Sequence, residues 1–340
     1  MLIVLLAPLV AALAQGDGPG TDVSDQDESA VGAPAPALLR WVPAYDPPDP
    51  GVVALGERLF FSLELSGDRS LSCASCHQPE HGFADPRPLS IGVGGATTRR
   101  HTPALLNRAL GRRFSWDGAA STLEEQVLLP ISNPVEMGSS VEESVRRLTG
   151  DAEWVSDFNG ALGRGPDREG LAACLSAFVR SLWTPQTPFD RFRAGNVSAL
   201  NDAQKAGFWL FESRGGCWRC HSGPNFTDED FHNTGVGARD GRPRPGRYSL
   251  SGKADHQGAF KTPTLRGLTR TGPYMHDGSL STLRDVVEFY SNGGTPNSNL
   301  SPSIRPLELS EKDVDHLVAF LRVLSEKEPE SVEDLSLIHI

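Results

Sequence analysis

The sequence is poor in long apolar runs and in basic residues. Beyond its N-terminus, no hydrophobic stretch reaches the roughly 20 residues that a transmembrane helix needs. The 340 residues carry 32 Lys and Arg against 43 Asp and Glu, a formal net charge of −11. This excess of acidic residues argues against binding to nucleic acids or to an anionic membrane surface, and by itself it favours a basic partner.

The apolar N-terminus predicts export. Residues 2–14 are apolar apart from Pro8 and end in Ala-Leu-Ala, a small-residue cleavage pattern, although no basic residue precedes them. We expect a signal peptide over 1–14, an acidic and disordered linker over 15–40, and a C-terminal tail over 327–340. The protein would then act in the periplasm, with neither a membrane nor a nucleic acid among its partners.

Alternating strand patterns are also scarce, and helical signals take their place. Ser121-x-x-Glu124 and Ser140-x-x-Glu143 match the capping box that opens a helix. Apolar residues recur at helical spacing in 171–182 and 317–324, and we also expect a helix over 283–291. We therefore predict an all-α fold.

Cysteine is scarce too, but its five copies form a pattern. Four of them make two Cys-x-x-Cys-His motifs, Cys73-Ala-Ser-Cys76-His77 and Cys217-Trp-Arg-Cys220-His221. The fifth, Cys174, lies in an apolar helical stripe and is expected to be a small core residue.

In Cys-x-x-Cys-His the two thiols form thioethers with the haem vinyl groups, and the His becomes the proximal iron ligand. A zinc site is the first alternative, but 144 residues separate the two motifs, far beyond zinc-ribbon spacing. A redox disulfide would need a βαβ context that the pattern does not offer. We expect two covalently bound haem c groups, with His77 and His221 as iron ligands.

The surroundings of the two motifs repeat each other. Matching pairs are 56–62 with 207–213, Thr102-Pro103 with Thr262-Pro263, and Trp116-Asp-Gly with His276-Asp-Gly. In each half the Thr-Pro pair begins fourteen residues before the segment that ends in Asp-Gly. The repeat indicates an internal duplication. We expect two cytochrome c-like domains, over 41–190 and 191–326, with long irregular Gly- and Pro-rich loops around the haems.

Methionine is nearly absent from the mature chain, which holds only Met137 and Met275. A low-spin electron carrier needs a sixth iron ligand, usually Met or His, whereas an iron with an open position can bind peroxide. The ligand on the far side of each haem therefore decides the function.

Several segments resemble the bacterial di-haem cytochrome c peroxidase and MauG family. They are Trp116-Asp-Gly, Leu123-Glu-Glu-Gln126, Pro130-Ile-x-Asn-Pro-Val-Glu136-Met137 and Pro273-Tyr-Met-His276-Asp-Gly. The similarity runs from about Val52 to Leu324 and keeps the family's order and spacing.

The resemblance implies a role for each matched residue. The His77 haem would react with hydrogen peroxide, and Glu136 would move a proton between the two peroxide oxygens. Gln126 would orient the distal ligand or water, and Trp116 would carry electrons between the haems. The His221 haem would be the low-spin partner.

The resemblance also distinguishes members of the family. Fourteen residues after the His of Pro-Tyr-x-His-Asp-Gly, the peroxidases have Met and MauG has Tyr; this sequence has Tyr290, opposite Pro130 in the repeat. A tyrosinate is a hard anionic ligand that favours higher oxidation states of iron. Peroxidases that need reductive activation carry a His sixteen residues after the proximal His, where this chain has Val93.

Two departures from the family pattern concern Ala119 and calcium. Ala119 stands where the family usually has Arg. Family members bind Ca²⁺ through an Asn and two backbone carbonyls, which map to His101, Thr271 and Pro273. Because calcium prefers oxygen ligands, His101 in place of Asn leaves the calcium site open to question.

The resemblance predicts a periplasmic, MauG-like peroxidase that uses hydrogen peroxide to oxidise Trp or Tyr side chains of a protein partner. One alternative is a peroxide-removing cytochrome c peroxidase fed by a small c-type cytochrome or a cupredoxin. Another is a di-haem electron carrier without catalytic activity.

Overall fold

The computed structural model describes residues 46–325. The predicted signal peptide and linker and the C-terminal tail lie outside this range. Within it, no helix combines the length and apolar character needed to cross a membrane.

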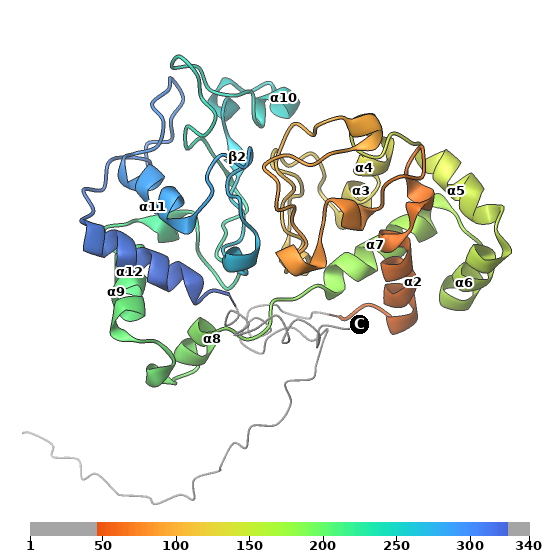
Figure 1. Ribbon diagram of the computed structural model, residues 1–340, viewed down its shortest axis with the longest axis horizontal. Helices are drawn as coiled ribbons and strands as arrows, with labels where there is room; N and C mark the ends of the chain where they lie inside the picture. The colour runs from red at the N-terminus through yellow and green to blue at the C-terminus, as the bar shows by residue number, and fades with distance from the viewer. Residues whose placement is uncertain (1–45, 326–340) are drawn as a thin grey trace, which may run out of the picture. The chain divides into compact units, whose positions relative to one another are not determined.

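The described chain is mostly helical, as predicted (Figure 1). The helices are α2 Pro50–Phe61, α3 Leu123–Gln126, α4 Leu129–Ser132, α5 Val141–Thr149, α6 Ala152–Leu162, α7 Arg168–Ser181, α8 Pro188–Arg193, α9 Asp202–Glu212, α10 Tyr248–Ser251, α11 Leu283–Ser291 and α12 Glu311–Arg322. The described strands, β1 Phe231–His232 and β2 Phe260–Lys261, pair antiparallel. The helices expected over 171–182, 283–291 and 317–324 are found as α7, α11 and α12.

Each Cys-x-x-Cys-His motif lies next to its own hydrophobic core. The first core surrounds α2 and α7, and its buried rings include Phe60, Phe83 and Phe178. The second surrounds α9 and α12 and contains Phe211, Phe226 and Phe320 (Figure 1). In the first trio the Phe60 centroid lies 4.9 Å from Phe178 and 6.0 Å from Phe83; in the second the Phe211 centroid lies 5.2 Å from Phe320 and 6.0 Å from Phe226.

A glycine permits close helix crossing in both cores. A Cβ on Gly56 of α2 would overlap the carbonyl oxygen of Cys174 on α7, and a Cβ on Gly207 of α9 would overlap that of His316 on α12. Cys174 is fully buried in this packing, which agrees with its predicted role as a core residue. These correspondences support the predicted duplication, which stays a prediction.

One predicted helix start was wrong by one residue. The cap of α3 is Thr122, whose hydroxyl accepts a hydrogen bond from the Glu125 N–H at 3.1 Å. The Ser121 hydroxyl instead donates to the Glu125 carboxylate at 2.9 Å. Thr122 and Ser121 offer the same capping chemistry one residue apart, so the sequence pattern placed the cap one residue too early.

The second predicted cap is confirmed only in part. Ser140 caps α5 by accepting from the Glu143 N–H at 3.1 Å. The Glu143 carboxylate does not close the box, because it accepts hydrogen bonds from Arg146 and Arg147.

The two crossing glycines provide a test of the paired cores. Gly56→Ala or Gly207→Ala should destabilise the haem-loaded protein by about 3 kcal/mol, the upper end for overpacking, because a backbone carbonyl cannot move aside easily. Gly160→Ala in α6 is the control: nothing lies within 4 Å of its Cβ, so the change should stabilise by about 0.5–1 kcal/mol. Denaturant unfolding measures both, and equal effects at Gly56 and Gly160 would contradict the packing argument.

Candidate haem sites and their junction

The backbone of the first motif orients His77. Cys73–Ser75 forms a 3₁₀ turn, and the His77 N–H donates to the Cys73 carbonyl at 2.9 Å. The ring Nδ1 lies 2.9 Å from the Phe83 carbonyl oxygen. Since a carbonyl only accepts, Nδ1 carries the proton and Nε2 keeps its lone pair for a metal.

The second motif repeats this arrangement. After the turn Cys217–Arg219, the His221 N–H donates to the Cys217 carbonyl at 2.9 Å, and Nδ1 donates to the Phe226 carbonyl at 2.9 Å. Phe226 has a φ of 51°, and its counterpart Phe83 has a φ of 57°. Burial lowers the pKa of both histidines, which favours the neutral form that binds iron.

The four motif cysteines are available for thioether formation. None of them is in a disulfide, and all four are half-buried. Burial raises the pKa of Cys73 and of Cys217 to about 12, so these thiols are held protonated. Two thiols and an oriented imidazole in each motif fit a covalently attached haem.

His276 fits a haem as well, through its orphaned ring nitrogens. The side chain is 6% exposed, both ring nitrogens are buried without a hydrogen-bond partner, and the nearest carboxylate, Asp277, is 3.8 Å away. Burial lowers the pKa of His276, the Asp277 carboxylate opposes this shift, and the guanidinium groups of Arg100 and Arg244 add to it. Two cations beside an unpartnered imidazole fit an anionic group such as a haem propionate.

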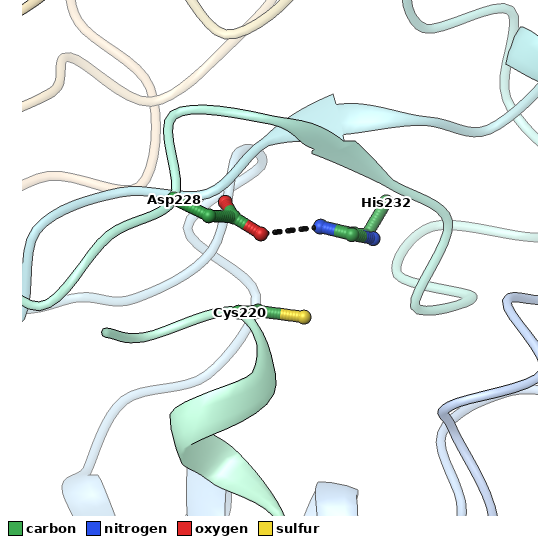
Figure 2. Close-up of side chains that lie close together, drawn as sticks. All are labelled: Cys220, Asp228 and His232. Atoms are coloured by element: carbon green, nitrogen blue, oxygen red, sulfur yellow. Dashed lines mark hydrogen bonds and ion pairs between the residues drawn. The ribbon is translucent and has the colours of Figure 1, made fainter. Parts of the chain in front are cut away.

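His232 lies beside the second motif, a position that the sequence did not reveal. Its Nε2 is 2.8 Å from an Asp228 carboxylate oxygen, and Figure 2 shows the pair next to Cys220. Hydrogen bonds with Asp228, the larger cause, and with Cys220 raise the pKa of His232 to about 10. Ligand atoms of these three residues lie within 4.8 Å of one another, as in a metal site. Because Cys220 belongs to Cys-x-x-Cys-His, haem attachment would consume the thiol that such a site needs.

Glu136 lies near the first motif. Burial raises its pKa, against a hydrogen bond with Asn133 that lowers it. Burial is the main cause that raises the pKa of Cys76, and the negative charge of Glu136 adds a smaller increase. Its carbonyl accepts from the Val93 N–H at 2.9 Å.

Gln126 is the last residue of α3, and its side-chain oxygen accepts from the Ser115 hydroxyl at 2.7 Å. Within residues 46–325, no hydrogen bond joins Gln126 to Glu136. The structure therefore brings Glu136 to the first motif and ties Gln126 to the residue before Trp116.

Trp116 connects the two halves of the chain. Its indole N–H donates to the His101 carbonyl at 2.8 Å, and the His101 N–H donates to the His276 carbonyl at 2.8 Å. The Trp116 carbonyl accepts from the Lys261 N–H at 2.7 Å. Its ring centroid lies 6.4 Å from that of His276, nearly perpendicular to it.

Tyr290 lies on α11 close to the second motif. Burial raises its pKa to about 12, a hydrogen bond with Thr234 opposes the shift, and the thiols of Cys220 and Cys217 add to it. The phenol is therefore within electrostatic reach of the cysteines that would hold the second haem.

Known proteins match this chain over most of its length. Residues 50–198 match the family model of the di-haem cytochrome c peroxidases. The methylamine utilization protein MauG of Methylorubrum extorquens is 40% identical over 284 residues, which is 83% of this chain and 80% of that protein. The chain belongs to the di-haem cytochrome c peroxidase and MauG family.

Other members of the family agree. Cytochrome-c peroxidase IdrP2 of Denitromonas iodatirespirans is 35% identical, covering 87% of this chain and 88% of its own. A MauG-like protein associated with microbial copper homeostasis has the same fold, with a TM-score of 0.78 and 31% identity, over 89% of this chain and 95% of its own. The family implies a haem oxidoreductase with two haems, peroxide as oxidant and a redox partner.

The calcium site that the family pattern suggests is not favoured by the side chains present. The ring Nδ1 of His101 faces the carbonyl oxygens of Arg87 at 3.1 Å and Pro88 at 3.2 Å. Burial lowers the pKa of His101, while carbonyls that include that of Thr271 raise it. An imidazole nitrogen among these carbonyls is a poor calcium ligand. The carbonyls of Thr271 and Pro273 thus lack the third, oxygen ligand of the family pattern.

A buried ion cluster lies at the junction, and sequence reasoning missed it. The Glu229 carboxylate accepts from Arg108 at 3.0 Å, from Lys261 at 3.2 Å and from the Arg112 N–H at 2.9 Å. Burial alone would raise the pKa of Glu229, but Arg108 and Lys261 outweigh it and lower the pKa to about 2. The cluster joins the chain before α3 to the loop after the second motif.

The ion cluster around Glu229 should make the stability of the protein depend on pH. Because the pKa of Glu229 falls from 4.5 to about 2 on folding, its stabilisation is present above pH 4.5 and is lost as the pH falls through 2. Glu229→Gln should destabilise the protein at pH 7 by about 3–5 kcal/mol, since two buried cations lose their counter-charge, and the penalty should shrink in acid.

Unfolding curves from pH 2 to 7 test it, with Glu142→Gln as the control. Glu142 pairs with Arg168 at the surface and should matter by less than about 0.5 kcal/mol. A Glu229→Gln penalty that stays constant with pH would contradict the assignment.

Proposed function

We propose that this protein is a periplasmic, MauG-like di-haem peroxidase that uses hydrogen peroxide to oxidise a protein partner. The observation that carries the proposal is Tyr290, which stands where the scavenging peroxidases have Met and whose phenol lies within electrostatic reach of Cys217 and Cys220.

In the proposal, Cys73 and Cys76 hold one haem with His77 as its iron ligand. Cys217 and Cys220 hold the other with His221. The carbonyls of Phe83 and Phe226 fix both ligand imidazoles through Nδ1. When bound, the haems supply the redox chemistry that accepts two oxidising equivalents from peroxide.

Glu136 is the proposed acid–base group. Its raised pKa suits a carboxyl that both takes up and releases a proton. The carboxylate would take the proton from one peroxide oxygen and return it to the other, which leaves as water.

Trp116 is proposed to carry electrons between the halves. It is half-buried and hydrogen-bonded to both of them. Its N–H donates to a carbonyl, which has no appreciable basicity, so the indole keeps its proton while electrons pass. Ser115 would hold Gln126 towards this region.

A peroxide-removing cytochrome c peroxidase is the second candidate. Several relatives carry that name at 30–35% identity. A small c-type cytochrome or a cupredoxin would then be the donor. The family consists of enzymes, so an electron carrier without catalysis is not proposed. We also propose that calcium is absent from the His101 region.

Glu136→Gln should slow haem oxidation by peroxide about 10²–10⁴-fold while both haems stay attached, because the proton transfer is lost. Stopped-flow absorbance after mixing with peroxide measures the rate constant, and Glu142→Gln serves as a surface control. An unchanged rate for Glu136→Gln would remove this residue from the mechanism.

Tyr290→Phe should change the low-spin haem signal in electron paramagnetic resonance, since the proposed oxygen ligand is removed. Tyr290→Met should raise the reduction potential of that haem, because a soft neutral ligand replaces a hard anionic one. Potentiometry and spectra of both variants decide. If neither variant alters the low-spin haem, Tyr290 is not a ligand and the MauG-like assignment loses its support.

A further inference from the structure

Positive charge is concentrated in more than one segment of this acidic protein. Residues 99–113 hold five Arg and no acidic residue, but Arg100 pairs there with Asp117 and Arg108 with Glu229. Residues 239–253 contain four Arg and one Lys against the single acidic residue Asp240, in a chain whose net charge is −11. We call this segment, which includes α10, the cationic platform. The cations are listed in full here: Arg239, Arg242, Arg244, Arg247 and Lys253.

Three of these cations, Arg239, Arg242 and Lys253, are free for a partner, whereas Arg244 lies beside His276, where it fits an anionic group such as a haem propionate. Arg239, Arg242, Arg244 and Lys253 are exposed, and none of them forms an ion pair with another residue in 46–325. Some surface arginines elsewhere, such as Arg58 and Arg284, pair with carboxylates, whereas Arg191 and Arg193 of α8 form no ion pair within 46–325. The platform therefore holds charge that the fold does not neutralise.

Two of the arginines are held opposite each other. Arg239 and Arg242 form an isolated antiparallel bridge, with N–H···O distances of 3.0 and 2.8 Å. The turn between them places both Asp240 and Gly241 at positive φ, 49° and 71°. Asp-Gly is the residue pair that such a two-residue turn favours, and Asp tolerates a positive φ. The turn therefore holds two like charges directly opposite each other, and an anionic partner would relieve their repulsion.

Apolar side chains accompany the charge. On α10, Tyr248 is 38% exposed and Leu250 is 54% exposed. An exposed aromatic side chain in a segment rich in arginine is the composition of a protein-binding surface. The platform therefore fits a folded protein better than a small anion.

The platform is attached to the junction between the halves. Arg247 donates to the Asp117 carbonyl, next to Trp116, at 2.8 Å, and its guanidinium lies 3.9 Å above the Phe231 ring of β1. Arg244 is close enough to lower the pKa of His276. A partner bound to the platform would therefore lie near Trp116, the proposed electron path.

We propose that the cationic platform is the docking surface for an acidic protein that donates electrons to this enzyme. The proposal rests on the function proposed above and names the class of partner. Peroxide takes up two electrons and two protons to give two waters, so two one-electron oxidations of the bound partner balance each turnover. The local charge thus reverses the preference for a basic partner that the net charge alone suggests.

The test compares two double variants of the haem-loaded protein with the same change in net charge. Arg239→Glu/Arg242→Glu reverses the platform. Arg191→Glu/Arg193→Glu reverses two exposed arginines of α8 that form no ion pair within 46–325. A third double variant, Arg239→Gln/Arg242→Gln, removes the platform charge without reversing it. Because it also relieves the like-charge contact, it tests the platform even if the charge reversal misfolds.

The probes are an acidic c-type cytochrome and a basic mitochondrial-type cytochrome c. Binding of the oxidised probes is measured by calorimetry at low and high salt, so this readout does not depend on catalysis. For the acidic probe, the platform reversal should raise Kd at least about tenfold at low salt and the α8 reversal less than about threefold, with the difference shrinking in high salt.

Equal effects of the two reversals, or tighter binding of the basic probe to the wild type, would overturn the proposal. Binding of anionic vesicles through the platform in place of the acidic cytochrome would also overturn it. Stopped-flow oxidation of the haems by peroxide without any donor tests the enzyme itself. A protein that binds the acidic probe through the platform but does not react with peroxide would refute the proposed function and leave the docking surface standing.

Discussion

The hydrogen bond from each motif histidine to a phenylalanine carbonyl is the contact on which the proposed haem sites depend. His77 and His221 each have two ring nitrogens, and only the one facing away from that carbonyl can bind iron. The carbonyl is held by the core, because the rings of Phe83 and Phe226 belong to the two buried aromatic trios. The close crossing at Gly56 and at Gly207 brings α7 and α12 to those rings. In each half, helix packing thus fixes one phenylalanine, and the carbonyl of that phenylalanine orients the proposed iron ligand, His77 or His221.

The junction between the halves uses a different kind of interaction. Neutral backbone hydrogen bonds hold Trp116 to His101 and Lys261, while the side chain of Lys261 enters the ion cluster around Glu229. Burying two cations with one carboxylate costs free energy of desolvation, and the attraction between them offsets this cost only while the hydrogen bonds keep their geometry. Movement of the second half against the first would separate Arg108 from Glu229. The cluster therefore favours one fixed placement of Trp116 between the motifs.

Local patterns could be predicted from the sequence, and long-range pairings could not. The motif cysteines and histidines, α11 and the cap Ser140 follow from spacing alone. The cap of α3 was misplaced because Ser121 and Thr122 are chemically equivalent neighbours. Arg108 and Glu229 are 121 residues apart, and no sequence pattern marks a charged residue that will be buried with its counter-ion. The roles of Glu136, Gln126 and Tyr290 rest on the family resemblance and stay proposals.

Charge is where the whole-chain view and the local view differ most. The net charge of −11 describes the field at long distance, where an acidic partner is repelled. Within a Debye length, about 8 Å at physiological salt, the partner meets only the nearest groups. An acidic protein is then attracted where Arg239 and Arg242 stand unpaired, and repelled by most of the remaining surface. Repulsion elsewhere improves specificity because it weakens non-productive encounters without weakening the docked complex. An acidic enzyme with a cationic docking surface can therefore select both its partner and the place where that partner binds, beside the strand and turn that hold Trp116.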